Sequence, residues 1–315
     1  MDAGDLLRGS LLKLADSTRV RDLVERAPVS RSVVRRFVPG AHLQDAVRAT
    51  GQLALTGRMA TIDYLGEDTR TLEQAQRIRD AYLVLVGMLA GRGYAADGRA
   101  EVSLKLTALG LLLPDGAHIA LDYARQIARA AADAGTTVTL DMEDHTRTDA
   151  TLAALRELRA DFPQTGAVVQ AYLHRTEADC RDLAYAGSRV RLCKGAYREP
   201  ESIAYQDGAE VDRAYVRCLR ILMEGAGYPM VATHDPRLVE IAAALAANTG
   251  RDPRSFEYQM LYGIRPDEQQ LIADRGDQMR VYVPVGDEWY GYLMRRMAEK
   301  PANVAFFLRG LATRG

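Results

Sequence analysis

The chain has 315 residues, of which 48% are hydrophobic and 26% are charged, so it can bury a large core without disulfide bonds. Its formal net charge of −1 excludes a general electrostatic attraction to nucleic acid or to an anionic membrane. The three cysteines form no CxxC pair, and no apolar run approaches the roughly 20 residues of a membrane span. The N-terminus lacks the pattern of a signal peptide, so we expect a cytoplasmic protein.

The first segment of the chain is helical in pattern. Apolar residues recur at helical spacing from about residue 6 to residue 56, with Pro28 and Pro39 as breaks. We therefore predict an N-terminal helical arm over residues 1–57. No basic module precedes it, so no nucleic-acid partner is expected.

Beyond the arm, short β-branched runs alternate with longer amphipathic helical segments, a pattern typical of parallel sheets. We predict strands at residues 60–65, 101–107, 137–142, 167–172, 190–194, 230–233, 255–260 and 279–283, and a last helix from about 287 to 300. Eight strand–helix units within residues 58–315 predict an α/β fold of the TIM type, a (βα)8 barrel. An open doubly wound sheet is the alternative, but the chain has no GxGxxG motif after an early strand.

Polar residues stand near nearly every predicted strand end. Active sites of (βα)8 barrels form at the C-terminal ends of the strands, where buried polar groups are costly unless they are paired or hold a ligand. An internal network of ion pairs and hydrogen bonds is the other explanation for each residue taken singly. The residues are Asp63, Lys105, Asp141, Glu143, Asp144, Gln170, Tyr172, Arg191, Lys194, Tyr197, Thr233, His234, Glu257, Gln259 and Tyr282.

Two segments carry most of the chemical information. In the run 191–197, RLCKGAY, two cations bracket a strand end and Gly195 allows a ligand to approach the backbone, which suits a phosphate or an electron-rich ring. In the last helix, four polar or aromatic residues share one face at i, i+3, i+4 and i+7, where the guanidinium groups could bind a carboxylate. A solvent-facing surface is the alternative for this face. Its residues are Tyr292, Arg295, Arg296 and Glu299.

Other chemistries find less support. The five histidines show no HxxxH or HxH spacing, so no metal site is expected, and no GxSxG motif is present. A Schiff-base aldolase remains an alternative, because Lys105 and Lys194 follow barrel strands where such lysines occur. A non-catalytic barrel that binds a ligand or partner is a further alternative.

Taken together, these segments resemble the proline dehydrogenase family, particularly its short monofunctional bacterial members. The matching motifs occur in order from about residue 60 to residue 303: ATIDYLGE, SLKLTALG, LDMEDH, VVQAYLHR, RLCKGAY, ATHD, FEYQMLYGIR and RVYVPVGDEWYGYLMRRMAEKPAN. The resemblance implies a distorted (βα)8 barrel that binds FAD at the strand C-termini and oxidises L-proline to Δ1-pyrroline-5-carboxylate by hydride transfer to flavin N5.

The resemblance also implies roles for individual residues. Residues expected to bind substrate or support catalysis are Lys105, Asp141, Tyr197, Leu261, Tyr282, Arg295 and Arg296. Residues expected to contact FAD are Val168, Gln170, Arg191, Lys194, Gly195, Ala196, Thr233, His234 and Glu299, to which we add Gln259 and Tyr292. The implied partners are a quinone electron acceptor, a membrane surface for peripheral association, and a downstream pyrroline-5-carboxylate dehydrogenase.

Overall fold

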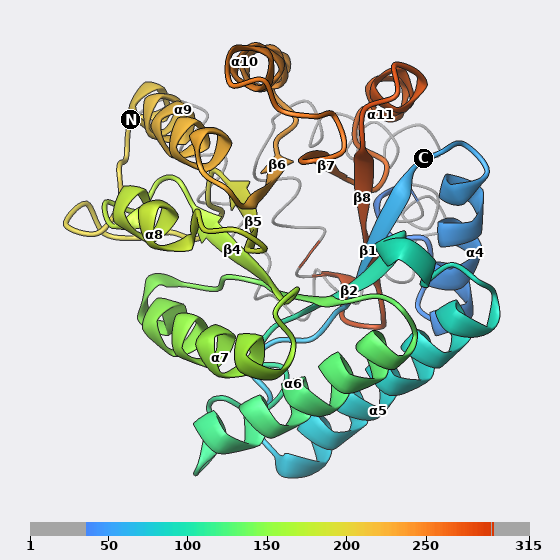
Figure 1. Ribbon diagram of the computed structural model, residues 1–315. Coiled ribbons are helices and arrows are strands. Elements are labelled where there is room, and N and C mark those ends of the chain that lie inside the picture. Colours follow the sequence, from blue (N-terminus) through green and yellow to red (C-terminus); the bar gives the residue numbers. More distant parts are fainter. Residues whose placement is uncertain (1–35, 291, 293–315) are drawn as a thin grey trace, which may run out of the picture.

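Eight parallel strands close into a barrel in which each strand pairs with its neighbours in sequence and β8 pairs with β1 (Figure 1). The structure, a computed structural model, describes residues 36–290 and residue 292. The prediction of a (βα)8 barrel is confirmed. The strands are β1 (Met59–Tyr64), β2 (Ala100–Leu104), β3 (Val138–Leu140), β4 (Gly166–Gln170), β5 (Arg189–Cys193), β6 (Tyr228–Ala232), β7 (Glu257–Leu261) and β8 (Met279–Val285).

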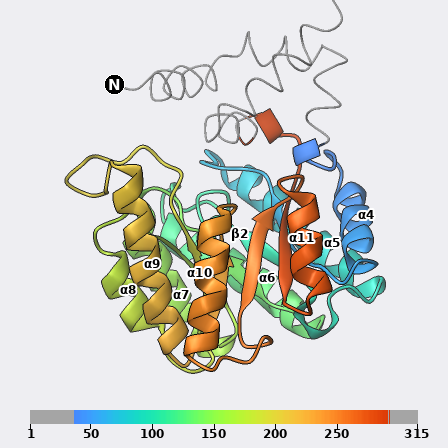
Figure 2. The same ribbon diagram turned by 90° about the horizontal axis from the view of Figure 1, so that it is seen from above.

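Helices surround the barrel, and one follows each of the first seven strands (Figure 1). The views in Figures 1 and 2 agree that α9 lies between α8 and α10 on the outside of the barrel. The helices are α5 (Leu72–Gly91), α6 (Gly116–Asp133), α7 (Thr148–Asp161), α8 (Thr176–Leu183), α9 (Gly208–Glu224), α10 (Pro236–Asn248) and α11 (Pro266–Asp274).

A helix that precedes the barrel completes this ring. The helix α4 (Leu43–Ala54) packs against β8, β1 and α5, and it stands between α11 and α5 in Figure 1. Its buried residues, which include Val47 and Leu53, belong to the main hydrophobic core. Residues 36–54 of the predicted arm are thus packed on the barrel, while residues 1–35 lie outside the described residues. The division into an arm (1–57) and a barrel (58–315) stays a prediction.

The two faces of the strands differ in polarity. Successive side chains of a strand point to opposite faces, so residues two apart share one face. On β2, Val102 and Leu104 are fully buried members of the hydrophobic core, whereas Glu101 and Ser103 bond to side chains from other strands across the barrel. The apolar face therefore packs beneath the helices, and the barrel interior is largely polar.

The N-terminal half of the barrel interior holds a balanced charge network, which we call the lower layer (Glu101, Arg189, Glu257 and Arg280). Arg280 donates to Glu257 at 2.7 and 3.1 Å, and Arg189 donates to Glu101 at 2.7 Å. Both carboxylates have no solvent exposure. Each charge therefore lies beside an opposite charge, as burial of ionised groups requires.

The lower layer corrects the sequence prediction for Glu257, which was expected near the C-terminal end of the seventh strand. Glu257 is instead the first residue of β7, because the strand begins two residues later than predicted. The residues before it form a turn: the Asp252 carboxylate accepts a hydrogen bond from the Arg254 amide, and Ser255 donates to the Asp252 carbonyl. This local bonding draws Ser255 out of the ladder.

Candidate functional site

Asp141 lies at the centre of a buried network at the C-terminal end of the barrel. Arg191 on β5 donates to its Oδ1 at 2.6 Å, and Tyr282 on β8 donates to its Oδ2 at 2.7 Å. Ser103 on β2 accepts from Arg191 at 3.0 Å and donates to Asp141 at 2.7 Å. The Arg191 guanidinium also lies over the Tyr282 ring, 5.4 Å from its centroid. Asp141 therefore fixes side chains from three other strands in one place.

Lys105 joins this network from the residue after β2. Its Nζ donates to Asp63 Oδ2 on β1 at 2.5 Å and lies 3.9 Å from Asp141 Oδ2. We call Asp63, Lys105, Asp141 and Arg191 the upper layer. Burial alone would lower the pKa of Lys105, but the charges of Asp63, Asp141 and Glu67 raise it above its usual value. The amine is therefore held protonated, which favours anion binding and disfavours the nucleophilic amine of a Schiff-base aldolase.

Glu143, in the loop after β3, connects the loop after β2 to the end of β4. Its carboxylate accepts hydrogen bonds from the amide and the hydroxyl of Thr107, and its backbone carbonyl accepts from Gln170 Nε2 at 2.8 Å. Burial raises the pKa of Glu143 to about 7, although the Thr107 bonds and the charge of Lys105 oppose this shift. Glu143 thus orients the Gln170 amide and carries a carboxyl group that titrates near neutrality.

The RLCKGAY segment is shaped by a ring beneath it. Gly195 has a φ of 118°, and a Cβ at this position would overlap the side chain of Tyr172. Only glycine fits here, both because of the backbone conformation and because of the ring. Lys194 is half-buried and pairs with Asp212 and, at 3.5 Å, with Asp235. It is therefore a neutralised cation at the rim rather than a member of the Asp141 network.

The ends of β6 and β7 bring together a further set of expected site residues. The Leu261 amide donates to His234 Nε2 at 3.0 Å, so a neutral His234 carries its proton on Nδ1. The Thr233 amide donates to the Gln259 carbonyl at 3.2 Å, and Gln259 Nε2 donates to Glu257 at 2.5 Å. Gln259 is therefore the side chain that links the upper part of β7 to the lower layer.

Among the buried polar atoms of the described residues that lack a hydrogen-bond partner, two belong to residues expected to contact the cofactor; Arg189 Nε in the lower layer also lacks one. The two are Arg191 Nε on β5 and Gln259 Oε1 on β7. A buried polar atom without a partner is costly, so both atoms are candidates to contact a bound ligand. Within the same described residues, no group of three or more His, Cys, Asp or Glu is placed to hold a metal ion.

The remaining expected residues fall into two groups. Val168 is buried on β4, Tyr292 is buried and helical, and Ala196 and Tyr197 are half-buried in the loop after β5. Arg295, Arg296 and Glu299 lie outside the described residues. The convergence of Lys105 with these two arginines, which the sequence predicts, therefore stays a prediction.

Sequence reasoning did not identify Ser103, although its hydroxyl contacts both Asp141 and Arg191. Ser103 lies in the middle of a predicted strand, whereas functional residues are expected at the strand ends. The signal was the period of two that places Glu101, Ser103 and Lys105 on one face. That pattern marks the inward face of the second strand over its whole length.

Comparisons with known proteins agree with this geometry. A family model described as proline dehydrogenase matches residues 46–309. The chain is 37% identical over 282 residues to proline dehydrogenase 1 of Bacillus subtilis, which covers 90% of this chain and 91% of that protein. It is 36% identical over 311 residues to proline dehydrogenase of Deinococcus radiodurans, with 97% and 98% covered.

A solved structure shares the architecture. It is proline utilization A (PutA) from Bdellovibrio bacteriovorus, inactivated by N-propargylglycine, with a TM-score of 0.80 and 27% sequence identity. The superposition covers 91% of this chain and 34% of that chain, so the present chain spans about a third of the PutA protein. The similarity therefore concerns one part of PutA.

Proposed function

Because the chain belongs to the proline dehydrogenase family, and is therefore an oxidoreductase that acts on proline, we propose that it oxidises L-proline to Δ1-pyrroline-5-carboxylate with FAD as its cofactor. One observation of the structure supports this reaction above others. Protonated Lys105 and Arg191 meet around Asp141 at the C-terminal ends of the strands, the place where (βα)8 barrels bind their substrates. Such a site suits an anionic substrate beside a redox group.

Substrate recognition would begin at Lys105. Its ammonium group is buried, charged and held by Asp63, so it can bind the proline carboxylate without losing its orientation. Arg295 and Arg296 are the proposed further partners of this carboxylate. The side chains of Tyr197, Leu261 and Tyr282 would pack around the pyrrolidine ring, and the Tyr282 hydroxyl is fixed by Asp141. A carboxylate bound at several points fixes the position of the reacting carbon.

The residues present fit a flavin. Arg191 Nε and Gln259 Oε1 are a buried donor and a buried acceptor without partners among the described residues, and a polar ring edge can satisfy both types of group. The residues proposed to hold FAD are Val168, Gln170, Arg191, Lys194, Gly195, Ala196, Thr233, His234, Gln259, Tyr292 and Glu299. When bound, FAD would supply the two-electron acceptor for the hydride.

The charges around the ring would assist the transfer. Arg191, fixed by Asp141 and Ser103, provides a positive charge that stabilises negative charge developing on a reduced cofactor. The substrate amine must be deprotonated before its neighbouring carbon can lose a hydride. Because Lys105 is protonated, water is the proposed acceptor of that proton. The rate should therefore rise with pH through the pKa of the bound amine.

Electron transfer onward is also part of the proposal. We propose a quinone as the acceptor and a pyrroline-5-carboxylate dehydrogenase as the enzyme that uses the product. Among residues 36–290, the structure contains no helix that is both long enough and apolar enough to cross a bilayer. Access to a membrane quinone would therefore use peripheral association in this part of the molecule.

An anaerobic titration with L-proline tests the proposed reaction. The purified chain should show flavin absorbance that L-proline bleaches, whereas D-proline at the same concentration should leave it unchanged. A folded, colourless chain that cannot take up FAD would contradict the proposed cofactor. A yellow chain that L-proline does not bleach would contradict the proposed substrate.

A further inference from the structure

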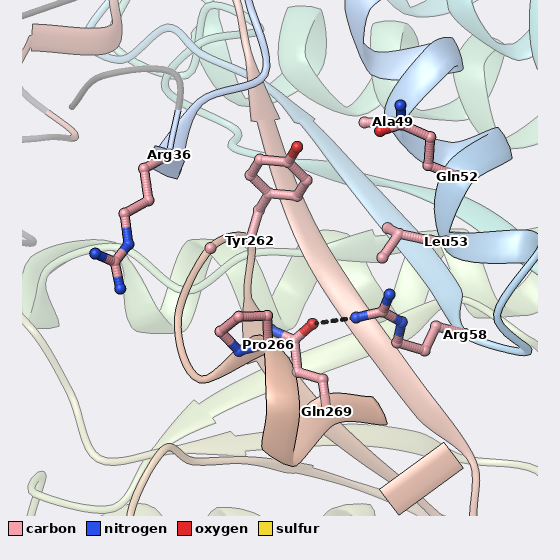
Figure 3. Close-up of a pocket in the computed structure, with 9 residues that line it drawn as sticks. Arg36, Ala49, Gln52, Leu53, Arg58, Tyr262, Pro266 and Gln269 are labelled. Carbon is pink, nitrogen blue, oxygen red and sulfur yellow. Dashed lines mark hydrogen bonds between the residues drawn. The ribbon is translucent and has the colours of Figure 1, made fainter. Parts of the chain in front are cut away.

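A cavity of about 260 Å³ lies outside the barrel, between α4 and the turn that joins β7 to α11 (Figure 3). Gln52 and Leu53 line it from α4, and Tyr262 and Pro266 line it from the turn. Tyr262 is the first residue after β7, and its amide donates a hydrogen bond to the Tyr282 carbonyl at 2.9 Å. The cavity shares no lining residue with the Asp141 network.

Arg58 provides a charge at the wall of this cavity. Its Nε donates to Thr56 Oγ1 at 3.0 Å and its Nη1 donates to Gln269 Oε1 at 3.2 Å. Both acceptors are neutral, and Arg58 forms no ion pair with any residue that the structure describes. Burial lowers the pKa of Arg58, an effect that the charges of Asp274 and Tyr262 oppose. A half-buried guanidinium bonded only to neutral oxygens leaves much of its charge uncompensated.

Gln269 holds this guanidinium in a fixed position. It is almost fully buried, and its Nε2 donates to the carbonyls of Leu261 at 3.0 Å and Ile264 at 2.8 Å. These bonds leave its Oε1 directed at Arg58, as Figure 3 shows. The two bonds of Arg58 occupy two of its five N–H groups, so further donors remain for a ligand. An oriented guanidinium loses little conformational entropy when it binds an anion.

The rest of the lining selects the ligand. Leu53, Pro266 and the Tyr262 ring provide apolar surface, and Arg58 provides the positive charge. Inorganic phosphate has no apolar part to cover this surface, and a neutral apolar molecule would leave the charge of Arg58 without a counter-ion. We propose that this cavity binds a small organic carboxylate. Arg58 binds the carboxylate group, and the apolar body of the ligand packs against Leu53, Pro266 and Tyr262.

Calorimetric titration of the full chain with benzoate tests this site. Benzamide, which has the same shape without the charge, and inorganic phosphate serve as the comparison ligands. We expect benzoate to bind more tightly than either. Arg58→Gln should weaken that binding by about tenfold or more, because it removes the charge-assisted bonds.

A second variant covers the case in which Arg58→Gln does not fold. Gln52 is exposed on α4, so Gln52→Glu should fold normally and should also weaken benzoate binding by placing a carboxylate at the rim. Arg77→Gln, at an exposed position of α5, is the matched control and should bind benzoate as the unmodified chain does.

Three results would overturn the proposal. The first is benzoate binding that neither Arg58→Gln nor Gln52→Glu weakens, because the ligand would then be elsewhere, for instance at the barrel mouth. The second is equal binding of benzamide, and the third is equal binding of phosphate. None of these readouts depends on proline oxidation, so the outcome is separate from that of the proposed reaction.

Discussion

The two ends of the barrel interior hold the same number of charges in different surroundings. The lower layer contains two glutamates and two arginines, and the upper layer contains two aspartates, one lysine and one arginine. In the lower layer, Glu257 receives two bonds from Arg280 and one each from Tyr228 and Gln259. In the upper layer, the described bonds to Asp63 come from Lys105 and, at 3.4 Å, from Tyr82.

This difference reverses the effect of the protein on carboxylate ionisation. Burial alone would raise the pKa of Glu257, but the charges of Arg280 and Arg189 lower it to about 2. Burial raises the pKa of Asp63, and the charge of Lys105 only partly opposes it. The lower layer therefore stabilises the ionised form of Glu257 and supports the fold, whereas the upper layer disfavours the ionised form of Asp63. Groups with unfavourable protonation states concentrate at functional sites.

Removing a charge from the lower layer should have the largest effect on stability. Arg280→Leu leaves Glu257 buried with its main partner gone, and breaking a buried ion pair in this way costs about 3–5 kcal/mol. Urea unfolding should show a loss of this size. Arg77→Leu, which breaks an exposed pair with Glu73, is the control and should change stability by less than about 1 kcal/mol. If the unfolding free energy of Arg280→Leu fell by no more than that of the control, the proposed structural role of the lower layer would be wrong.

Removing a charge from the upper layer should affect catalysis more than stability. In Lys105→Met, Asp63 can become protonated because its pKa is already raised, so the unfolding free energy should fall less than in Arg280→Leu. The substrate carboxylate would lose its charged partner, and kcat/KM for proline should fall by about 100-fold or more. Steady-state kinetics and urea unfolding of the same samples measure both quantities. The comparison fails if Lys105→Met destabilises the chain as much as Arg280→Leu does.

The fold was predictable because its signals are local. Each strand is a short apolar run followed by a helical pattern, and eight repeats of this unit have few other arrangements than a closed barrel. The start of β7 was misplaced because Asp252 and Ser255 form a turn whose hydrogen bonds compete with the ladder. The position of α4 in the helix ring was not predictable, because its packing against β8 joins segments more than 200 residues apart.

The candidate site was predictable in its residue types but not in its pairing. The motifs identified Lys105, Asp141 and Arg191, since charged residues at strand ends stand out against apolar runs. That Asp141 binds Arg191 and Tyr282 could not be inferred, because these contacts connect residues 50 and 141 positions apart. The ion pairs of the lower layer could not be predicted for the same reason. The partner of a polar residue inside a strand depends on which strands face each other across the closed barrel.

Replacing Glu143 should change how the unfolding free energy depends on pH, without breaking a buried ion pair. The folded pKa of Glu143 is about 7 and its ordinary value is 4.5, so the folded state retains a proton that the unfolded chain loses. The unfolding free energy of the unmodified chain should therefore fall as pH rises from about 4.5 to about 7, with a slope from this group of at most about 1.4 kcal/mol per pH unit.

In Glu143→Gln that contribution is absent, so the difference in unfolding free energy between the two chains should change through this window and stay constant above it. Unfolding by urea at a series of pH values measures this difference, and it cancels the contributions of histidines common to both chains. A constant difference from pH 4 to pH 8 would show that Glu143 is ionised normally. Of the two carboxyl groups Asp63 and Glu143 at the upper end of the barrel, Asp63 alone would then have a raised pKa.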